Sequence, residues 1–433
     1  MESSVVILIS DEGLGGVIPF GRAIKEHGME PMLITGEVSK SHLQHWKEIF
    51  IKIHVIDNPY DYKIIKESAQ ELAKEKRIVA IFSCYDGTVL PAAQAAKELN
   101  VPHPNIDGLF NSRNKYQMRK ITREGNLPTP KFALVGSIKE CYFIKDNIGY
   151  PVVIKPINGM ASHLVKLVKN EEQLIEAYHY LEERISDNFY GNYSNFIQFY
   201  DGINENINPL KTFLVEEFIQ GNEYCAEIII KDGEFHRVAL FQKILEDTIK
   251  FHENGFVYPA FDLEEKREEM LWEHIEQCLT VLEINNCSAH VEIKDSENGP
   301  FLIEVNAGRA GGSIIVKAVK EILGIDLINE VIAIQGRLRA PNKVIKNEIE
   351  RIGILSIFSH KSGRLKKIEG IEELKKLNGV IDVIPFSFPG DIIDITDKEV
   401  FSLNVLVSNL TQIEMEHLHK AANELIEFII DSV

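Results

Sequence analysis

Along the first hundred residues, short apolar runs alternate with segments whose apolar positions recur every three or four residues. Short apolar runs between turn formers are typical of buried strands, and the periodic segments are typical of amphipathic helices. The pattern predicts strands at residues 5–10, 31–35 and 78–83, and helices at residues 20–27, 63–75 and 89–99. Alternation of this kind predicts a parallel sheet covered by helices, which is an α/β domain.

Beyond residue 113 strands and helices no longer alternate regularly, which favours α+β units. The expected strands are residues 150–156, 164–168, 211–218, 223–231, 234–243, 354–358, 380–384 and 402–408. The expected helices are residues 114–123, 171–181, 264–282, 314–323, 327–334, 371–377 and 411–430. Residues 186–210 are polar and aperiodic, which predicts an insertion or a mobile loop.

Residues 289–294 and 301–306 are two strand-like runs around a cluster of turn formers, and they predict a β-hairpin. If they pair symmetrically about Asn298, Glu292 and Glu304 lie opposite each other, with Asn306 on the same face. Facing carboxylates about 5 Å apart repel, and a divalent cation removes that penalty. Two carboxylates and an amide oxygen suit Mg²⁺. The alternative is a solvated sheet face with ordinary charges.

The segment that follows the hairpin favours the metal site. Arg309 is a lone cation in the glycine-rich stretch 306–312, and such an arginine suits an anion beside a metal. The apolar residues expected on the opposite face are Val291, Ile293, Ile303 and Val305. That face fits both alternatives, so the arginine decides between them.

Composition narrows the range of partners. A chain of 433 residues implies several domains, and 45% hydrophobic with 26% charged residues is typical of a globular protein. The net charge of −18 argues against nucleic acid, which needs a basic surface, but a nucleotide needs only a few local cations. No run is long enough for a membrane span, and residues 5–9 are too short for a signal peptide. Five scattered cysteines predict reduced thiols and a cytoplasmic location.

Several motifs together resemble the ATP-grasp superfamily of carboxylate–amine ligases, most closely its L-amino acid ligases. They are Lys115 in Asn-Lys-Tyr-Gln-Met-Arg, Lys155 in Pro-Val-Val-Ile-Lys-Pro, the run 214–223 and the acidic hairpin. The resemblance covers almost the whole chain. It implies a Rossmann-like pre-ATP-grasp domain at 1–112 and an ATP-grasp domain at 113–345. That domain has a small lid lobe at about 145–217 and a large lobe at about 218–345, and a small α+β domain follows at 346–433.

The resemblance also assigns nucleotide contacts. Lys115 and Lys155 match the two lysines that the family places against the phosphates. Residues 158–162 match its mobile glycine-rich loop, where Ser162 is a phosphate contact, although Gly159 is the single glycine here and a bulky His163 follows. The connector residues implied to hold adenine and ribose are Glu216, Glu217, Phe218, Ile219 and Glu223. Residues 13–16, by contrast, have the wrong spacing for a dinucleotide fingerprint and are expected to line a cleft.

Further matches concern the substrates. Glu292, Glu304 and Asn306 coincide with the family's Mg²⁺ ligands. Arg309 matches the arginine that contacts the transferred phosphate and the acyl phosphate, and is the catalytic candidate. Gly311 and Gly312 are expected to offer backbone N–H groups to a substrate carboxylate. Glu253 is expected to pair with the ammonium of the amino acid that is activated, and an exposed loop carboxylate is the alternative.

The implied activity is ATP- and Mg²⁺-dependent formation of a dipeptide from two amino acids, with ADP and phosphate as products. Mn²⁺ is an alternative metal, and a homodimer is left open. Two other functions are compatible with the motifs. One is an ATP-grasp carboxylase or formyl-type ligase acting on bicarbonate, formate or a biosynthetic intermediate. The other is a nucleotide-binding regulator without turnover. The net charge hints weakly at a cationic amino acid substrate.

Overall fold

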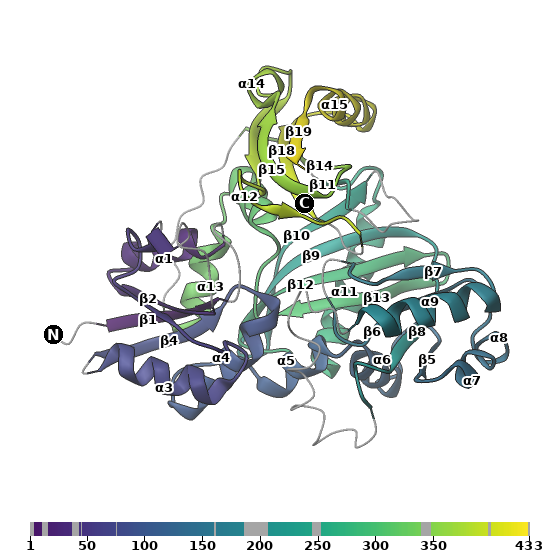
Figure 1. The fold of residues 1–433 in the computed structure, drawn as a ribbon, viewed down its shortest axis with the longest axis horizontal. Helices are drawn as coiled ribbons and strands as arrows, with labels where there is room; N and C mark the ends of the chain where they lie inside the picture. Colours follow the sequence, from purple (N-terminus) through teal and green to yellow (C-terminus); the bar gives the residue numbers. More distant parts are fainter. Residues whose placement is uncertain are drawn as a thin grey trace.

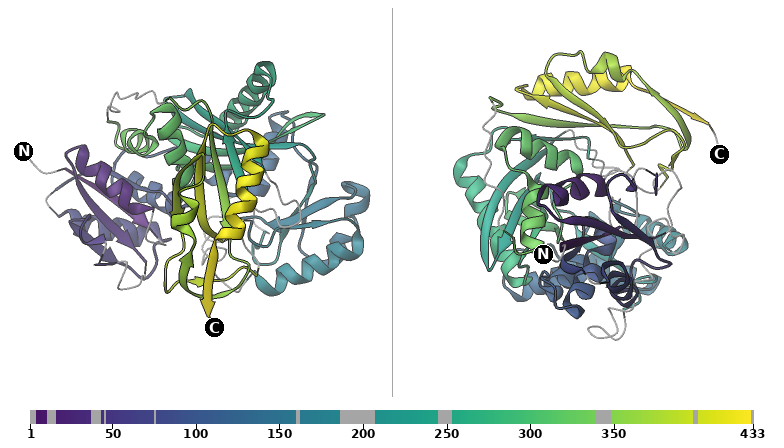
Figure 2. Two further views of the ribbon diagram at one scale, coloured as in Figure 1. Left: turned by 90° about the horizontal axis from the view of Figure 1, so that it is seen from above. Right: turned by 90° about the vertical axis from the view of Figure 1, so that its left-hand side faces the viewer.

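The computed structural model describes residues 4–10, 16–36, 43–44, 46–74, 76–159, 162–185, 207–244, 253–338, 348–396 and 400–431. The N-terminal domain and the small lobe flank a large central sheet, which continues into the C-terminal strands (Figure 1). The other two views show the C-terminal strands and α15 (Gln412–Leu425) lying across one side of the molecule (Figure 2). No helix in the described part of the chain is long and apolar enough to cross a bilayer.

The N-terminal domain is the predicted α/β unit. Its elements are β1 (Ser4–Ser10), α1 (Val17–Glu26), β2 (Glu30–Thr35), β3 (Lys52–Val55), α3 (Tyr62–Ala73), β4 (Arg77–Ser83) and α4 (Asp86–Glu98). The strands are all parallel, in the order β3-β2-β1-β4, which confirms the sheet type. The sequence pattern missed β3, because this edge strand is half exposed and lacks an apolar run.

Two helices, α5 (Ile106–Arg113) and α6 (Lys115–Glu124), lead to the small lobe. Its elements are β5 (Phe132–Val135), α7 (Ile138–Cys141), α8 (Ile144–Asn147), β6 (Val152–Pro156), β7 (Lys166–Val168), α9 (Glu171–Arg184) and β8 (Phe213–Glu217). They form a four-stranded antiparallel sheet, β5-β8-β6-β7, with α9 packed on one face. Because β5 belongs to this sheet, the lobe begins before residue 145. Most of the expected insertion at 186–210 lies outside the described residues.

The large lobe is built on an eight-stranded sheet of order β13-β12-β9-β10-β11-β14-β18-β16. Its first part comprises β9 (Asn222–Lys231), β10 (Glu234–Ile244), β11 (Gly255–Tyr258), α11 (Glu265–Val281), β12 (Cys287–Ser296), β13 (Gly299–Ala307), α12 (Ser313–Leu323) and α13 (Leu327–Gln335). The turn between β9 and β10 has positive φ at Asp232 and Gly233, as a tight hairpin requires.

The C-terminal strands continue this sheet. They and their neighbours are β14 (Ile352–Phe358), β15 (Gly363–Glu369), α14 (Ile371–Leu374), β16 (Val380–Pro385), β17 (Ile392–Ile393), β18 (Phe401–Ser408), α15 and β19 (Glu427–Asp431). β14 pairs with β11, so hydrogen bonding crosses the predicted boundary at residue 345. The predicted helix 411–430 ends instead at Leu425, because its last residues pair with β15 as β19.

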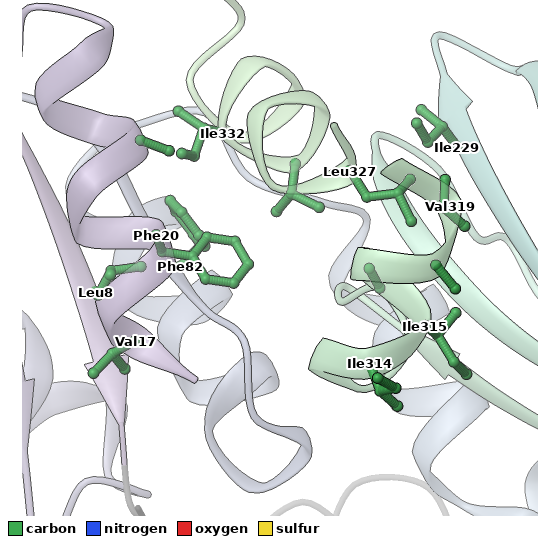
Figure 3. Packing of buried hydrophobic residues seen from close by; sticks show 14 of the residues in the cluster. Leu8, Val17, Phe20, Phe82, Ile229, Ile314, Ile315, Val319, Leu327 and Ile332 are labelled. Atoms are coloured by element: carbon green, nitrogen blue, oxygen red, sulfur yellow. The ribbon is translucent and has the colours of Figure 1, made fainter. Parts of the chain in front are cut away.

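Helices α12 and α13 pack between the N-terminal domain and the central sheet, with α13 against α1 and β4 and α12 against β14. Figure 3 shows Ile315 and Val319 of α12 near Ile229 of β9, with Phe20 and Phe82 of the N-terminal domain on the other side. This shared apolar cluster places the first turn of α12 at the junction of the lobes. The functional residues discussed below collect at that junction.

Candidate functional site

A cavity of about 1330 Å³ lies where the lobes meet. It is lined by one face of the central sheet, by β6 and β8 of the small lobe, by the first turn of α12 and by the loop after β4. All the predicted site residues line it: Lys115, Lys155, Ser162, Glu216, Glu217, Phe218, Ile219, Glu223, Glu253, Glu292, Glu304, Asn306, Arg309, Gly311 and Gly312. The fold therefore collects in one place residues that are far apart in the sequence.

The acidic hairpin has the predicted register. Glu292 lies opposite Glu304, and His290 lies opposite Asn306. One difference occurs beside this pair, where the register shifts by one residue. The shift turns Ile303 toward the cavity, so the prediction that Ile303 lies on the core face is wrong; Leu302 takes that place in the apolar core.

Arg119 of α6, Lys155 of β6 and Glu216 of β8 form a charged cluster, here called the lid cluster, on the small-lobe side of the cavity. The Glu216 carboxylate accepts from Arg119 Nε at 2.7 Å and contacts Lys155 Nζ at 2.6 Å. Arg119 is fully buried and also donates to the carbonyls of Leu302 and Ile303, which ties this cluster to the acidic hairpin. The sequence analysis missed Arg119, although the cation-rich helix that carries it was predicted.

The Glu216 carboxylate is ionised in this setting. Burial alone would raise its pKa, but Arg119 and Lys155 outweigh that effect and lower the pKa to about 2. Burial is the largest effect on Lys155 and lowers the pKa of its ammonium despite the attraction of Glu216. Both oxygens of Glu216 contact these cations. This pairing contradicts the expectation that the Glu216 side chain binds adenine.

The connector after Glu216 presents its backbone to the cavity. The Phe218 N–H donates to the Pro151 carbonyl at 3.2 Å, whereas the Ile219 N–H has no acceptor within the described ranges. The Phe218 ring lies 5.2 Å from Lys294 Nζ. Gly221 has φ +146, and a Cβ there would lie 2.0 Å from the Asp295 carbonyl oxygen. Glycine therefore lets the connector pass close against β12.

A second cluster, here called the acidic cluster, surrounds Lys243 of β10. Its Nζ lies 2.6 Å from Glu223, 2.6 Å from Glu253 and 3.0 Å from Glu292. Burial would lower the pKa of Lys243, but the three carboxylates outweigh it and raise the pKa well above its ordinary value. The sequence analysis did not single out Lys243, because one lysine at the end of a strand has no motif around it.

The hairpin carboxylates differ in their electrostatic setting. Burial and the neighbouring carboxylates outweigh Lys243 and raise the pKa of Glu292 to about 6. Glu304 has the opposite balance: burial would raise its pKa, but Lys115, whose Nζ is 3.0 Å away, lowers it. Within the described residues no group of three His, Cys, Asp or Glu could hold a metal. A metal here would need the amide of Asn306, which is buried at the same face.

Arg309 is held at the end of the cavity by the N-terminal domain. Its Nη2 contacts Asp86 Oδ2 at 2.7 Å, and Arg113 Nη1 contacts the other oxygen at 2.8 Å. Burial would lower the pKa of Arg309, but Asp86 outweighs it and raises the pKa further. Gly308 has φ +91 and lies against Val89 of α4, so the loop reaches Asp86 only with glycine at that position. Asp86 and Arg113 were not predicted.

Glu227 and His290 form a buried pair behind the Arg309 loop. His290 Nδ1 lies 2.6 Å from Glu227 Oε1, and the Gly311 N–H donates to both oxygens of Glu227 at 3.1 and 2.9 Å. Because this N–H is already used, the expectation that Gly311 offers it to a substrate carboxylate is wrong. Gly312 precedes the first turn of α12 and remains the candidate for that role.

The remaining predictions are only partly described. Ser162 and His163 line the cavity, but residues 160–161 lie outside the described ranges. Gly16 lines the cavity, whereas residues 13–15 are likewise not described. The Glu217 carboxylate accepts from the Lys131 N–H at 3.3 Å, and the Glu217 N–H donates to the Lys131 carbonyl at 2.8 Å.

Residues 148–317 match the family profile described as ATP-grasp domain. The chain therefore contains an ATP-grasp domain.

Comparison with individual proteins extends the likeness beyond this domain. The crystal structure of an L-amino acid ligase from Bacillus licheniformis superposes with a TM-score of 0.81 and 21% identity, covering 99% of both chains. The L-arginine-specific L-amino acid ligase of Bacillus subtilis is 21% identical over 86% of this chain and 85% of its own length. An uncharacterized protein, y4rH, of Sinorhizobium fredii is 24% identical over 74% of this chain, which spans 61% of that relative. The fold is that of the ATP-grasp ligases.

Proposed function

We propose that this protein is an ATP- and Mg²⁺-dependent carboxylate–amine ligase that joins two amino acids. One observation carries the proposal: cations suited to phosphates and carboxylates suited to a metal and an ammonium face one cavity. The names of the relatives, two of them L-amino acid ligases, support amino acids as the substrates.

The lid cluster and its neighbours suit the nucleotide. Lys155 and Lys115 are rigidly placed ammonium groups that would face the phosphates. The Ile219 N–H would donate to the adenine ring, and Glu223 would accept from the ribose hydroxyls. When ATP binds, its phosphates would add negative charge where two cations share one carboxylate. This balance supports ATP at the small-lobe side of the cavity.

The hairpin suits a hard divalent cation. Glu292 and Glu304 oppose each other directly, Asn306 adds an amide oxygen, and the raised pKa of Glu292 marks excess negative charge at this face. These three residues would hold Mg²⁺, with Mn²⁺ as the alternative. A bound Mg²⁺ would neutralise phosphate charge and orient the β- and γ-phosphates. The donor set of oxygens, with neither thiolate nor imidazole, supports this metal class.

The proposed reaction has two steps. A carboxylate oxygen of the first amino acid attacks the γ-phosphorus of ATP, the bond to the bridging oxygen breaks, and ADP leaves with that electron pair. The amine of the second amino acid then attacks the acyl carbon, phosphate leaves, and the nitrogen loses a proton. Arg309, fixed by Asp86, would pair with the phosphoryl oxygens, and Gly312 would donate to a substrate carboxylate. Exclusion of water protects the acyl phosphate from hydrolysis.

Glu253 would receive the ammonium of the first amino acid. Its carboxylate contacts Lys243 Nζ at 2.6 Å, so a substrate ammonium must share or displace that lysine. Three carboxylates surround Lys243, and Lys294 contacts only one of them, Glu223, at 3.4 Å, so negative charge remains for a further cation. Bicarbonate or formate would carry no cation to this place, which disfavours the carboxylase alternative. A regulator without turnover would not need the Arg309–Asp86 contact beside the phosphate site.

Two further expectations belong to this proposal. The five cysteines are free thiols, which supports a cytoplasmic location. A homodimer stays a prediction, and light scattering of the purified chain would measure it.

Release of ADP tests the proposal most directly. The twenty amino acids would be supplied singly and in pairs with MgATP, and products would be identified by mass spectrometry. We expect ADP and phosphate to appear in equal amounts with a dipeptide for at least one pair. ADP release with bicarbonate or formate, and none with any amino acid pair, would favour the alternative ligase.

A further inference from the structure

The cavity continues beyond the charged clusters onto the C-terminal strands. Its lining at this end is mainly apolar and aromatic. The residues are Ile314 from α12, together with Ile384, Pro385, Phe386, Phe388, Ile392 and Phe401 from the C-terminal segment. Phe388 and Ile392 are 40% and 46% exposed, so they contribute accessible apolar surface to this lining. None of these residues is among those assigned above to the nucleotide or the metal.

The strand register shows that this end adjoins Glu253. Lys243 pairs with Phe256, and Phe256 with Ile354, so the cavity face of the sheet runs from β10 across β11 to β14. The Ser356 N–H donates to the carbonyl of Asn254, the residue after Glu253, at 2.9 Å. Asn404 on β18 lies opposite Ser356. β11 and β18 are two strands apart, roughly 10 Å at ordinary sheet spacing.

The charged side chains at the C-terminal end of the cavity have partners within the protein. Lys317 pairs with Asp382, and Lys320 pairs with Asp326 at 2.7 Å. The Asp391 carboxylate accepts from the Phe388 N–H at 2.8 Å and closes a local turn. The described part of this lining thus lacks the uncompensated charge cluster that marks the Glu253 side. A charged side chain here would lose its hydration without gaining an equivalent partner.

A buried amide side chain, Asn404, also belongs to this lining. Asn404 is 2% exposed, and its Oδ1 has no hydrogen-bond partner in the described structure; the same holds for Oγ of the neighbouring Ser356. A buried amide without a partner is costly. Its position in the cavity lining therefore suits a ligand that brings a neutral hydrogen-bonding group to that depth.

We infer that this end of the cavity is the side-chain pocket for the amino acid held at Glu253. That amino acid has a large, neutral, mainly apolar side chain, best with a neutral polar group at its end. The inference rests on the proposed function and deepens it by naming the substrate class. It also contradicts the suggestion from net charge that the substrate is a cationic amino acid. The carboxylates named above at this end already have partners within the protein.

The first test compares amino acids on the wild-type protein. Binding to the enzyme with Mg²⁺ and a non-hydrolysable ATP analogue would be measured by calorimetry, and ADP release would be measured with a fixed second amino acid. We expect phenylalanine, tyrosine, methionine and leucine to exceed arginine, lysine, glutamate and alanine by about 10-fold or more in affinity and in kcat/KM. Preference for a charged or a small amino acid would overturn the inference.

Variants locate the pocket. Phe386→Ala should lower kcat/KM for phenylalanine by about 10- to 100-fold and change that for alanine by less than about 3-fold. Asn404→Leu should reduce the preference for tyrosine over phenylalanine. Ile413→Ala, at a 64% exposed position on α15, is the matched control and should leave the profile unchanged. Thermal unfolding of each variant separates loss of folding from loss of selectivity.

The outcomes separate the inference from the proposed function. If no amino acid pair releases ADP, the proposed function fails, while the binding series still decides the substrate class. If ADP is released but Phe386→Ala lowers all amino acids equally, the pocket assignment is wrong and the ligase proposal stands. An unchanged profile in both variants would equally place the side chain elsewhere.

Discussion

The lid cluster and the acidic cluster face the same cavity with opposite residual charge. In the lid cluster two cations, Arg119 and Lys155, share one carboxylate, which leaves one positive charge. In the acidic cluster Lys243 shares three carboxylates, and Lys294 contacts one of them, Glu223, at 3.4 Å, which leaves one negative charge. Each cluster is paired well enough to be buried but not neutralised. The difference indicates that one side is built for an anion and the other for cations.

Among the substitutions at this cavity, Glu304→Gln should have the largest effect on activity. It removes charge from the hairpin without changing its shape, and we expect ADP release to fall about 10³-fold or more, with weaker Mg²⁺-dependent ATP binding. Steady-state kinetics and calorimetry would measure both. Glu297→Gln, at the exposed hairpin turn, is the control. Retention of most wild-type turnover would contradict the metal assignment.

Glu253→Ala tests whether the acidic cluster receives a substrate ammonium. Truncating one member of a desolvated charge pair costs about 2–5 kcal/mol, so kcat/KM for the first amino acid should drop roughly 30-fold to several thousand-fold. The KM for ATP should change little. A des-amino analogue has no ammonium to lose, so its turnover should fall far less. Equal losses for both compounds would contradict the ammonium contact and would favour bicarbonate or formate as the substrate.

Lys243→Gln removes the cation that the three carboxylates share. We expect the free energy of unfolding to fall by about 3 kcal/mol, because the three carboxylates then repel one another with only Lys294, 3.4 Å from Glu223, as a counter-charge. Added Mg²⁺ should restore part of the loss by binding the folded state. Denaturant unfolding with and without Mg²⁺ measures both effects, with exposed Lys231→Gln as the control. No loss of stability would mean that water already screens this cluster.

The lid cluster predicts a pH dependence of stability. The pKa of Glu216 is near 4.5 when unfolded and about 2 when folded. Its contribution, about 3 kcal/mol, is therefore complete above pH 4.5 and is lost as pH falls toward 2. Unfolding measured between pH 6 and 3 should show this loss in the wild type, and Glu216→Gln should lack that component. Parallel curves for the two proteins would contradict the pairing.

Lys155→Ala should have the smallest effect of the series. Loss of one charged hydrogen bond to phosphate should raise the KM for ATP by about 10- to 100-fold, while the KM for each amino acid changes little. Glu216 keeps Arg119, so folding should survive. Lys169→Ala, exposed on the small lobe, is the control. An equal rise in all three KM values would indicate general destabilisation.

Local pattern predicted most of the elements and the acidic hairpin. The Glu292–Glu304 pairing follows from two-residue periodicity and a turn, which are properties of adjacent residues. The sequence missed β3, β11 and β19, which are short and gain their pairing from distant strands. Lys243, Asp86 and Glu227 were missed for the same reason, because each matters through a partner many residues away.

The sequence by itself determined the acidic hairpin and the lone Arg309 after it by residue type and spacing, and the family resemblance singled out Lys115 and Lys155 as candidate site residues. Only the tertiary structure decided how each is used. It engaged Glu216 with two cations and the Gly311 N–H with Glu227, and it joined the C-terminal strands to the central sheet. Hydrogen bonds and charge pairing act over a few ångströms, so they depend on which distant segments the fold brings into contact.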